Sequence, residues 1–250
     1  MKRAEAVSNI MSKAWRWVPI LLWVLLSMPE MGAPQDRQIF VRDNFMNLEN
    51  WRPFFFPKEK KPTAYAVETI DNGKVLKASS DASASGLVMK KSFNVYEYPK
   101  VRWRWRIMSV YEKGDVRIKS GDDYPLRIYI LFPYDPMQAG ALEKLRSELI
   151  KSVYGEYPPH SALNYIWANR EDERGLIVRN AFDSRAIMIA LQAGKRNIGT
   201  WQEEQVNIVD DYRKAFGKKP PPLATIGIMN DSDNTKERST SYLAFIEVSR

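Results

Sequence analysis

Arginine side chains with a regular spacing give the clearest chemical signal in this sequence. Arg102, Arg104 and Arg106 alternate with apolar residues, so all three would project from one face of an extended strand. Like charges on one face repel each other, and guanidinium groups pair well with carboxylates and sulfates. The stripe therefore predicts a surface that binds an acidic glycan. The alternative is an outward strand face paired with Asp and Glu on neighbouring strands.

Two adjacent carboxylates precede a second apolar segment. Asp122 and Asp123 follow Gly121, which permits a tight turn, and the next segment carries Arg127 and Tyr129. Paired carboxylates can hydrolyse glycosidic bonds, but neighbouring residues on a strand point in opposite directions. We therefore expect a turn in which the carboxylates accept backbone N–H groups or pair with Arg127. The catalytic residues, if there are any, stay unknown.

Oxygen-bearing side chains repeat at every second position in the segment from Asn230 to Thr235. Asp231 and Asp233 resemble the first half of a calcium loop. Lys236 stands where such a loop needs glycine, and the glutamate that would close the loop is missing. A weak calcium site is one expectation, and no other cofactor is expected. A polar turn between two strands, with Asn234 available to a ligand, is the other.

Aromatic side chains form a further candidate group, since their large apolar faces can stack on sugar rings. Most aromatics of a β-rich chain belong to the core, and we expect this of Trp103 and Trp105. Trp167 could serve either purpose. The single histidine, His160, leaves any Ser-His-Asp triad dependent on one residue and receives no role. The candidates for stacking are Trp51, Phe54, Phe55, Phe56, Tyr165, Trp167 and Trp201.

The elements that must position these residues are mostly strands. Alternation predicts a half-buried strand over 101–107, and a nearly continuous apolar run predicts a central strand over 126–132. Asp71-Asn72-Gly73 predicts a hairpin turn between two further strands. The other expected strands cover 65–70, 74–78, 185–191, 224–229 and 242–248.

Two segments have helical spacing. The first begins at Asp135, ends at Gly155 and carries the apolar stripe Leu142, Leu145, Leu149 and Val153. The second begins at Thr200 with Glu203 in a capping-box position and ends at Gly217. Many strands, two short helical insertions and no βαβ rhythm predict a mainly β fold. We expect a jelly-roll-like antiparallel sandwich that forms one domain over 34–250.

The first 33 residues are typical of an export signal. Basic residues precede an apolar run of 13 residues over 17–29, and a membrane-spanning helix needs about 20. Cleavage after Ala33 is expected, although Met31 is a poor residue for such a site. The alternative, an uncleaved anchor, is the one membrane attachment we expect. Met11 is a second candidate start. The protein is expected to be exported to the periplasm or the exterior.

The composition narrows the class of function. Of 250 residues, 44% are hydrophobic and none is cysteine, which excludes disulfides, thiolate nucleophiles and cysteine-bound zinc. The 38 Lys and Arg against 30 Asp and Glu give a net charge of +8. This excess is spread along the chain and is compatible with an anionic partner, but we expect no nucleic acid.

The ordered motifs over about 40–248 resemble the bacterial family catalogued as domain of unknown function 3047. They are Trp103-Arg-Trp105, Gly121-Asp-Asp-Tyr-Pro-Leu-Arg127, Asn164-Tyr-Ile-Trp167 and Asn230-Asp-Ser-Asp-Asn-Thr235. The resemblance implies an exported β-sandwich and supplies no catalytic residues. Its polar motifs match Gly121, Asp122, Asp123, Arg127, Asp231, Asp233 and Asn234.

Three functions stay open at this stage. The first is a non-catalytic module that binds a polysaccharide or another envelope ligand. The second is a carboxylate-dependent glycan hydrolase or lyase, which requires two carboxylates within about 5–10 Å across a cleft. The third is a structural envelope protein that binds other proteins. Convergence of the aspartates and Arg127 on a buried network would indicate a structural role for them.

Overall fold

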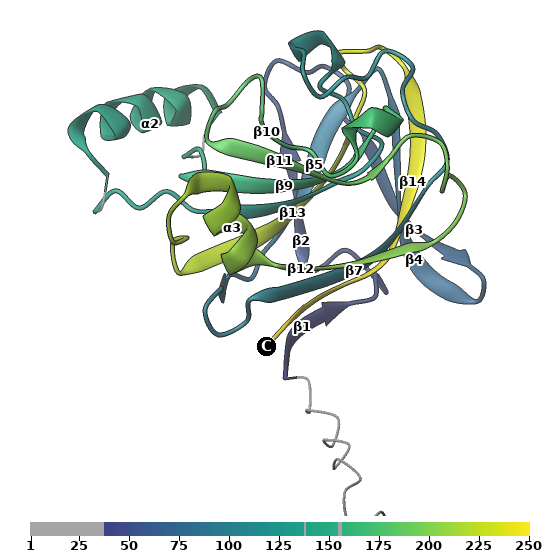
Figure 1. The fold of residues 1–250 in the computed structure, drawn as a ribbon, viewed down its shortest axis with the longest axis horizontal. Coiled ribbons are helices and arrows are strands. Elements are labelled where there is room, and N and C mark those ends of the chain that lie inside the picture. Colours follow the sequence, from purple (N-terminus) through teal and green to yellow (C-terminus); the bar gives the residue numbers. More distant parts are fainter. Residues whose placement is uncertain (1–37, 138, 155–156) are drawn as a thin grey trace, which may run out of the picture. The chain divides into compact units, whose positions relative to one another are not determined.

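Two β-sheets pack face to face in the computed structural model, which describes residues 38–137, 139–154 and 157–250 (Figure 1). The six-stranded sheet contains β1 (Ile39–Asp43), β3 (Ala64–Ile70), β4 (Gly73–Asp81), β7 (Lys100–Ile107), β12 (Gln202–Asn207) and β14 (Arg238–Ser249). The eight-stranded sheet contains β2 (Trp51–Phe55), β5 (Ala84–Met89), β6 (Phe93–Asn94), β8 (Arg127–Phe132), β9 (Ser161–Ala168), β10 (Ile177–Arg179), β11 (Ala186–Ala193) and β13 (Leu223–Asp231).

The strand order confirms the expected, mostly antiparallel sandwich. The smaller sheet runs β12-β7-β14-β4-β3 with β1 on β14, and the larger runs β10-β11-β9-β8-β13-β5-β2 with β6 on β13. One pair of described strands, β9 and β11, is parallel. The predicted hairpin joins β3 to β4, where Asp71 and Asn72 have positive φ angles of 51° and 62°. The expected export signal and the alternative start lie outside the described residues.

Alternation along the strands builds the core between the sheets. On β7, Val101, Trp103, Trp105 and Ile107 are fully buried, as the sequence predicts. The rings of Trp103 and Trp105 meet edge to face at 5.6 Å, and Trp105 contacts Trp167 of the opposite sheet at 5.7 Å. These indoles remove large apolar surfaces from water and so stabilise the contact between the sheets.

The long connection over 108–126 supplies a second, smaller core. Its residues Val116 and Tyr124 pack on Ile166 of β9 and Met188 of β11. Strand β9 is therefore buried on both faces, which explains why the sequence pattern over 161–168 gives no period-two signal. The same connection brings Asp122 and Asp123 close to Arg127 on β8.

The second predicted helix begins later in the structure than the sequence predicts, at Ile208 and not at Thr200. Residues 202–207 form β12, an edge strand that pairs with β7, and only α3 (Ile208–Phe216) is helical. Asn207 caps α3, because its side chain accepts hydrogen bonds from the N–H groups of Val209 and Asp210. Gly217 ends the helix in the left-handed conformation, as expected.

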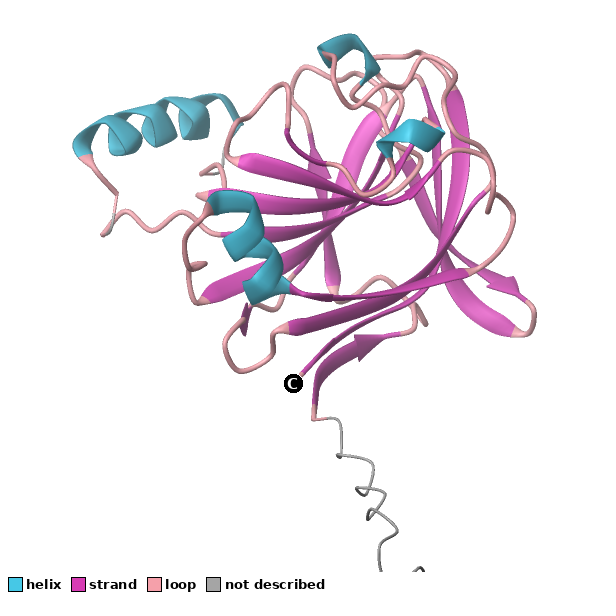
Figure 2. Cartoon of the chain, in the orientation of Figure 1, coloured by secondary structure: helices cyan, strands magenta, loops and turns pink. Residues whose placement is uncertain are grey.

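The first predicted helix forms as α2 (Ala141–Tyr154), which begins later than the predicted start at Asp135, and the three leucines of its apolar stripe lie outside the core. Leu142, Leu145 and Leu149 are 85%, 61% and 61% exposed. Figure 2 shows α2 and α3 at the same end of the sheets, with α2 standing apart from the strands. No helix of the described chain is both long enough and apolar enough to cross a membrane.

Candidate functional site

Arg127 on β8 lies at the centre of a buried ionic network. It is 3% exposed, and its Nε and Nη2 atoms both donate to the carboxylate of Asp231, with Nε 2.8 Å from Oδ1. Nη2 also donates to the carbonyl oxygen of Asp122 at 2.8 Å, and the ring of Tyr124 covers the guanidinium at 4.5 Å. Burial alone would lower the pKa of Arg127, but neighbouring groups such as Tyr129 and Asp122 raise it, so the side chain stays charged.

Asp123 anchors the turn between β13 and β14. Its carboxylate is fully buried and accepts hydrogen bonds from the backbone N–H groups of Asn234 and Thr235 and from the side-chain amide of Asn234. These donors compensate the buried charge. Asn234 is therefore engaged within the protein, and the polar turn expected from the sequence is present.

The same turn gathers three carboxylates. Asp123, Asp231 and Asp233 each place one oxygen within 4.8 Å of the others. Burial raises the pKa of Asp233, and the negative charge of Asp123 adds to the rise. However, the oxygens of Asp123 already accept N–H donors and those of Asp231 already bind Arg127. A cation would have to compete with these partners.

Calcium is therefore expected to change the stability of the protein very little. Thermal unfolding in 2 mM calcium (roughly the range of weak extracellular sites) and in excess chelator should give midpoints within about 1 °C of each other, because a cation must displace the partners that Asp123 and Asp231 already have. A rise of several degrees in calcium that Asp233→Ala abolishes would instead establish a cation site.

The burial of the aspartates decides against a catalytic pair among them. Asp122, Asp123 and Asp231 are 4%, 0% and 1% exposed; Asp122 and Asp231 pair with Arg127, and Asp123 binds the turn at Asn234 and Thr235. Their positions account for stability and for the shape of the turn. Buried to this extent, they offer no surface to a polymeric ligand.

Trp167 was a candidate for ligand binding, and the structure places it elsewhere. Its side chain is fully buried between the sheets, and Nε1 donates to the carbonyl oxygen of Gly194 at 3.2 Å. Of the two purposes that the sequence left open for Trp167, its burial favours the core. The alternation of β9 points Leu163, Tyr165 and Trp167 toward the core.

Tyr129 is the half-buried member of the group around Arg127. Burial raises the pKa of its hydroxyl group, and the positive charge of Arg127 opposes this rise. Asn164, opposite Tyr129 on β9, is fully buried and is a polar residue that sequence reasoning did not select. Its only signal was its place in the family motif.

The arginine stripe lies on the outer face of the six-stranded sheet and divides into two parts. Arg102 donates to Glu203 at 2.9 Å and to Glu247 at 3.4 Å, as the paired-strand alternative predicts. Arg104 and Arg106 form no ion pair with any described residue. Their guanidinium groups lie over the ring of Trp201, at 5.4 and 4.6 Å from its centroid.

A positively charged aromatic surface results from this stacking. Arg106 also lies 5.1 Å from the ring of Tyr242, and both aromatic side chains are partly exposed. A guanidinium held beside a ring by a cation–π contact can still donate its exposed N–H groups to another partner. We define the Arg104–Trp201 face as Arg104, Arg106, Trp201 and Tyr242. It offers both ring surface and unpaired cationic donors.

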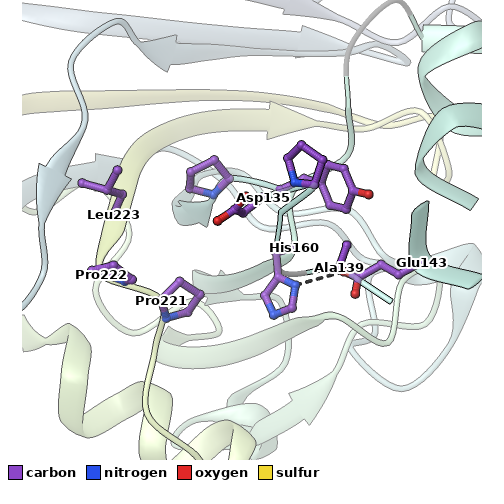
Figure 3. Close-up of a pocket in the computed structure, with 10 residues that line it drawn as sticks. Asp135, Ala139, Glu143, His160, Pro221, Pro222 and Leu223 are labelled. Atoms are coloured by element: carbon purple, nitrogen blue, oxygen red, sulfur yellow. Dashed lines mark hydrogen bonds and ion pairs between the residues drawn. The ribbon is translucent and has the colours of Figure 1, made fainter. Parts of the chain in front are cut away.

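Two adjoining cavities of about 370 and 470 Å³ lie beside α2 and share Glu143 and His160. Figure 3 shows the His160 ring turned toward Glu143, with Pro221, Pro222 and Leu223 across the smaller cavity. The Nδ1 atom of His160 is 3.0 Å from the carboxylate of Glu143. The sequence assigns no role to His160, and the structure shows its side chain half-buried beside Glu143.

The chain is a mostly antiparallel β-sandwich that contains a buried Arg127 network and an ordered set of sequence motifs. The family model for a "Protein of unknown function (DUF3047)" matches residues 49–247, and the chain belongs to this family. The resemblance expected from the motifs is thereby confirmed. No curated protein matches the sequence.

Solved structures with a similar arrangement of strands include a carbohydrate-binding module, an endoglucanase and a lectin. The carbohydrate-binding module CtCBM11 has 10% identity and a TM-score of 0.41, over 87% of this chain and 98% of its own. Endoglucanase 3 of Trichoderma harzianum has the same identity and TM-score, over 87% and 99%. The winged bean acidic lectin has 10% identity and a TM-score of 0.35, over 80% and 99%. Likenesses at this level assign no ligand to the chain.

Proposed function

We propose that this protein is a non-catalytic module that binds an acidic polysaccharide through its Arg104–Trp201 face. The observation that carries the proposal is that Arg104 and Arg106 lie within cation–π distance of Trp201 and lack a carboxylate partner among the described residues. Unpaired guanidinium groups are ready to bind the carboxylates or sulfates of a sugar. Export to the periplasm or the exterior is part of the proposal.

The strand geometry suits a polymer. Side chains two residues apart on β7 stand about 7 Å apart along the strand, so two guanidinium groups can bind charges on one extended chain. The rings of Trp201 and Tyr242 add apolar surface for sugar faces. The nearby carboxylates of Glu203 and Glu247 are held by Arg102, and Glu247 is also held by Arg42 at 2.7 Å. Because both are engaged in ion pairs, binding is favoured over hydrolysis at this face.

The proposal is tested by measuring the affinity for polygalacturonate and for uncharged dextran at two salt concentrations. We expect polygalacturonate alone to bind, and its affinity to fall as salt rises, because screening weakens exposed charge pairs. The double variant Arg104→Ala/Arg106→Ala should raise the dissociation constant by about ten-fold or more. Equal binding of dextran, or an unchanged affinity of the variant, would refute the proposal.

A matched control distinguishes the face from general positive charge. Arg117 is an exposed arginine outside the stripe, where it pairs with Asp172 at 2.8 Å. Arg117→Ala should leave the affinity for polygalacturonate unchanged to within about two-fold, because a charge away from the binding face is screened. An equal loss in Arg117→Ala would mean that net charge, and not this face, holds the polymer.

A further inference from the structure

The two cavities beside α2 differ in chemical character. The smaller has an apolar wall of four prolines, Ala139 and Leu223, and its other lining residues are Tyr134, Asp135, Glu143 and His160. The larger is lined by four cationic side chains, Arg146, Arg179, Arg185 and Lys218, and by a single carboxylate, Glu143. Because both cavities include Glu143 and His160, one ligand could extend from the apolar part into the cationic part.

The cations of the larger cavity are not all satisfied within the protein. Arg185 pairs with Asp183 at 2.6 Å, and Arg179 donates to the carbonyl oxygen of Ser184 at 3.1 Å. Arg146 and Lys218 have no hydrogen bond or ion pair with any described residue. Glu143, which contacts Nδ1 of His160 at 3.0 Å, sets one carboxylate against these four cationic side chains. The cavity therefore has an excess of positive charge that an anion would compensate.

The walls of the larger cavity also contain aromatic surface. Phe216 of α3 is partly exposed and lines it, and the ring of the buried Tyr212 lies 4.4 Å behind that of Phe216. Volumes of 370 and 470 Å³ fall in the range that accommodates small organic ligands. Apolar walls beside unpaired cations suit a ligand that has an apolar body and an anionic group.

We propose that these cavities form a second binding site, separate from the Arg104–Trp201 face, for an amphiphilic organic anion. The phosphate or carboxylate head binds Arg146 and Lys218, and the apolar body lies against the prolines and Leu223. This inference goes beyond the proposed polysaccharide binding and involves none of the same residues.

Calorimetric titration with decyl phosphate, below its micelle concentration, tests the proposal. Inorganic phosphate supplies the head alone, and decyl maltoside supplies the tail with an uncharged head. Decyl phosphate should bind at least about ten-fold more tightly than either, because only it engages both cavities. Equal binding of inorganic phosphate, or of decyl maltoside, would overturn the proposal, as would no binding of decyl phosphate.

Two variants locate the site, and both change exposed side chains. Arg146→Gln/Lys218→Gln and, separately, Leu223→Ser should each weaken decyl phosphate binding by about ten-fold. Arg104→Ala/Arg106→Ala should leave this binding unchanged while abolishing polygalacturonate binding, so the two proposals fail or hold separately. Unchanged affinity in both cavity variants would contradict the assignment.

Discussion

Replacing Arg127 by alanine is expected to lower the free energy of unfolding by roughly 3–5 kcal/mol, because the change leaves buried charges without their partner. Asp231 would lose its bidentate cation, and the carbonyl of Asp122 would lose a donor. Both residues are almost fully buried, so water cannot replace the guanidinium. Urea unfolding followed by circular dichroism measures the loss.

Two comparisons show whether the loss comes from the buried pair. Arg238→Ala removes an exposed arginine that pairs with Asp81 at 2.7 Å, and should change stability little. The double variant Arg127→Met/Asp231→Leu should be more stable than Arg127→Ala, because it does not leave the Asp231 carboxylate buried without its bidentate cation. A stable, normally folded Arg127→Ala protein would contradict the structural role of the network.

Two tryptophans are expected to respond in opposite ways to replacement by alanine. Trp167→Ala should lower the free energy of unfolding by about 3–5 kcal/mol, because it leaves a cavity between the sheets. Trp201→Ala should keep most of the stability and lose the affinity for polygalacturonate, because Trp201 supports Arg104 and Arg106 on the surface. Urea unfolding and polymer binding, measured on both variants, check the contrast.

One result of the tryptophan comparison would contradict the expected contrast between the two variants. A stable Trp167→Ala variant that no longer binds polygalacturonate would place the ligand at Trp167. Such a result would also contradict the packing of Trp167 against Trp105.

Local patterns in the sequence predict the strands well where one face is buried and the other exposed. The alternation over 101–107 predicts β7 and the burial of Trp103 and Trp105. Strand β9 does not show this alternation, because the connection over 108–126 covers its second face and both faces are buried. The segment over 202–207 resembles a helix start, but its hydrogen bonds to β7 come from a distant part of the chain.

The candidate sites also depend on contacts between distant parts of the chain, which local sequence patterns do not predict. The sequence singles out Arg127 and Asp231, but they are 104 residues apart, and only the fold shows that they bind each other. The sequence likewise suggests an arginine stripe but does not reveal which arginines keep a free guanidinium. The cavities beside α2 combine residues from several separate segments, and no local spacing reveals them.

Nitrogen-15 NMR of side-chain N–H groups during titration with oligogalacturonate tests the central claim most directly. Because the Nε atom of Arg106 is buried, the reporters are the Nε–H of Arg104 and the indole N–H of Trp201, whose signals should shift in a saturable, salt-sensitive way. The buried indoles of Trp103 and Trp167 should not. Assignment follows from single Arg→Lys and Trp→Phe replacements. Saturable shifts confined to other side chains, or no shifts at millimolar oligosaccharide, would contradict the proposed binding face.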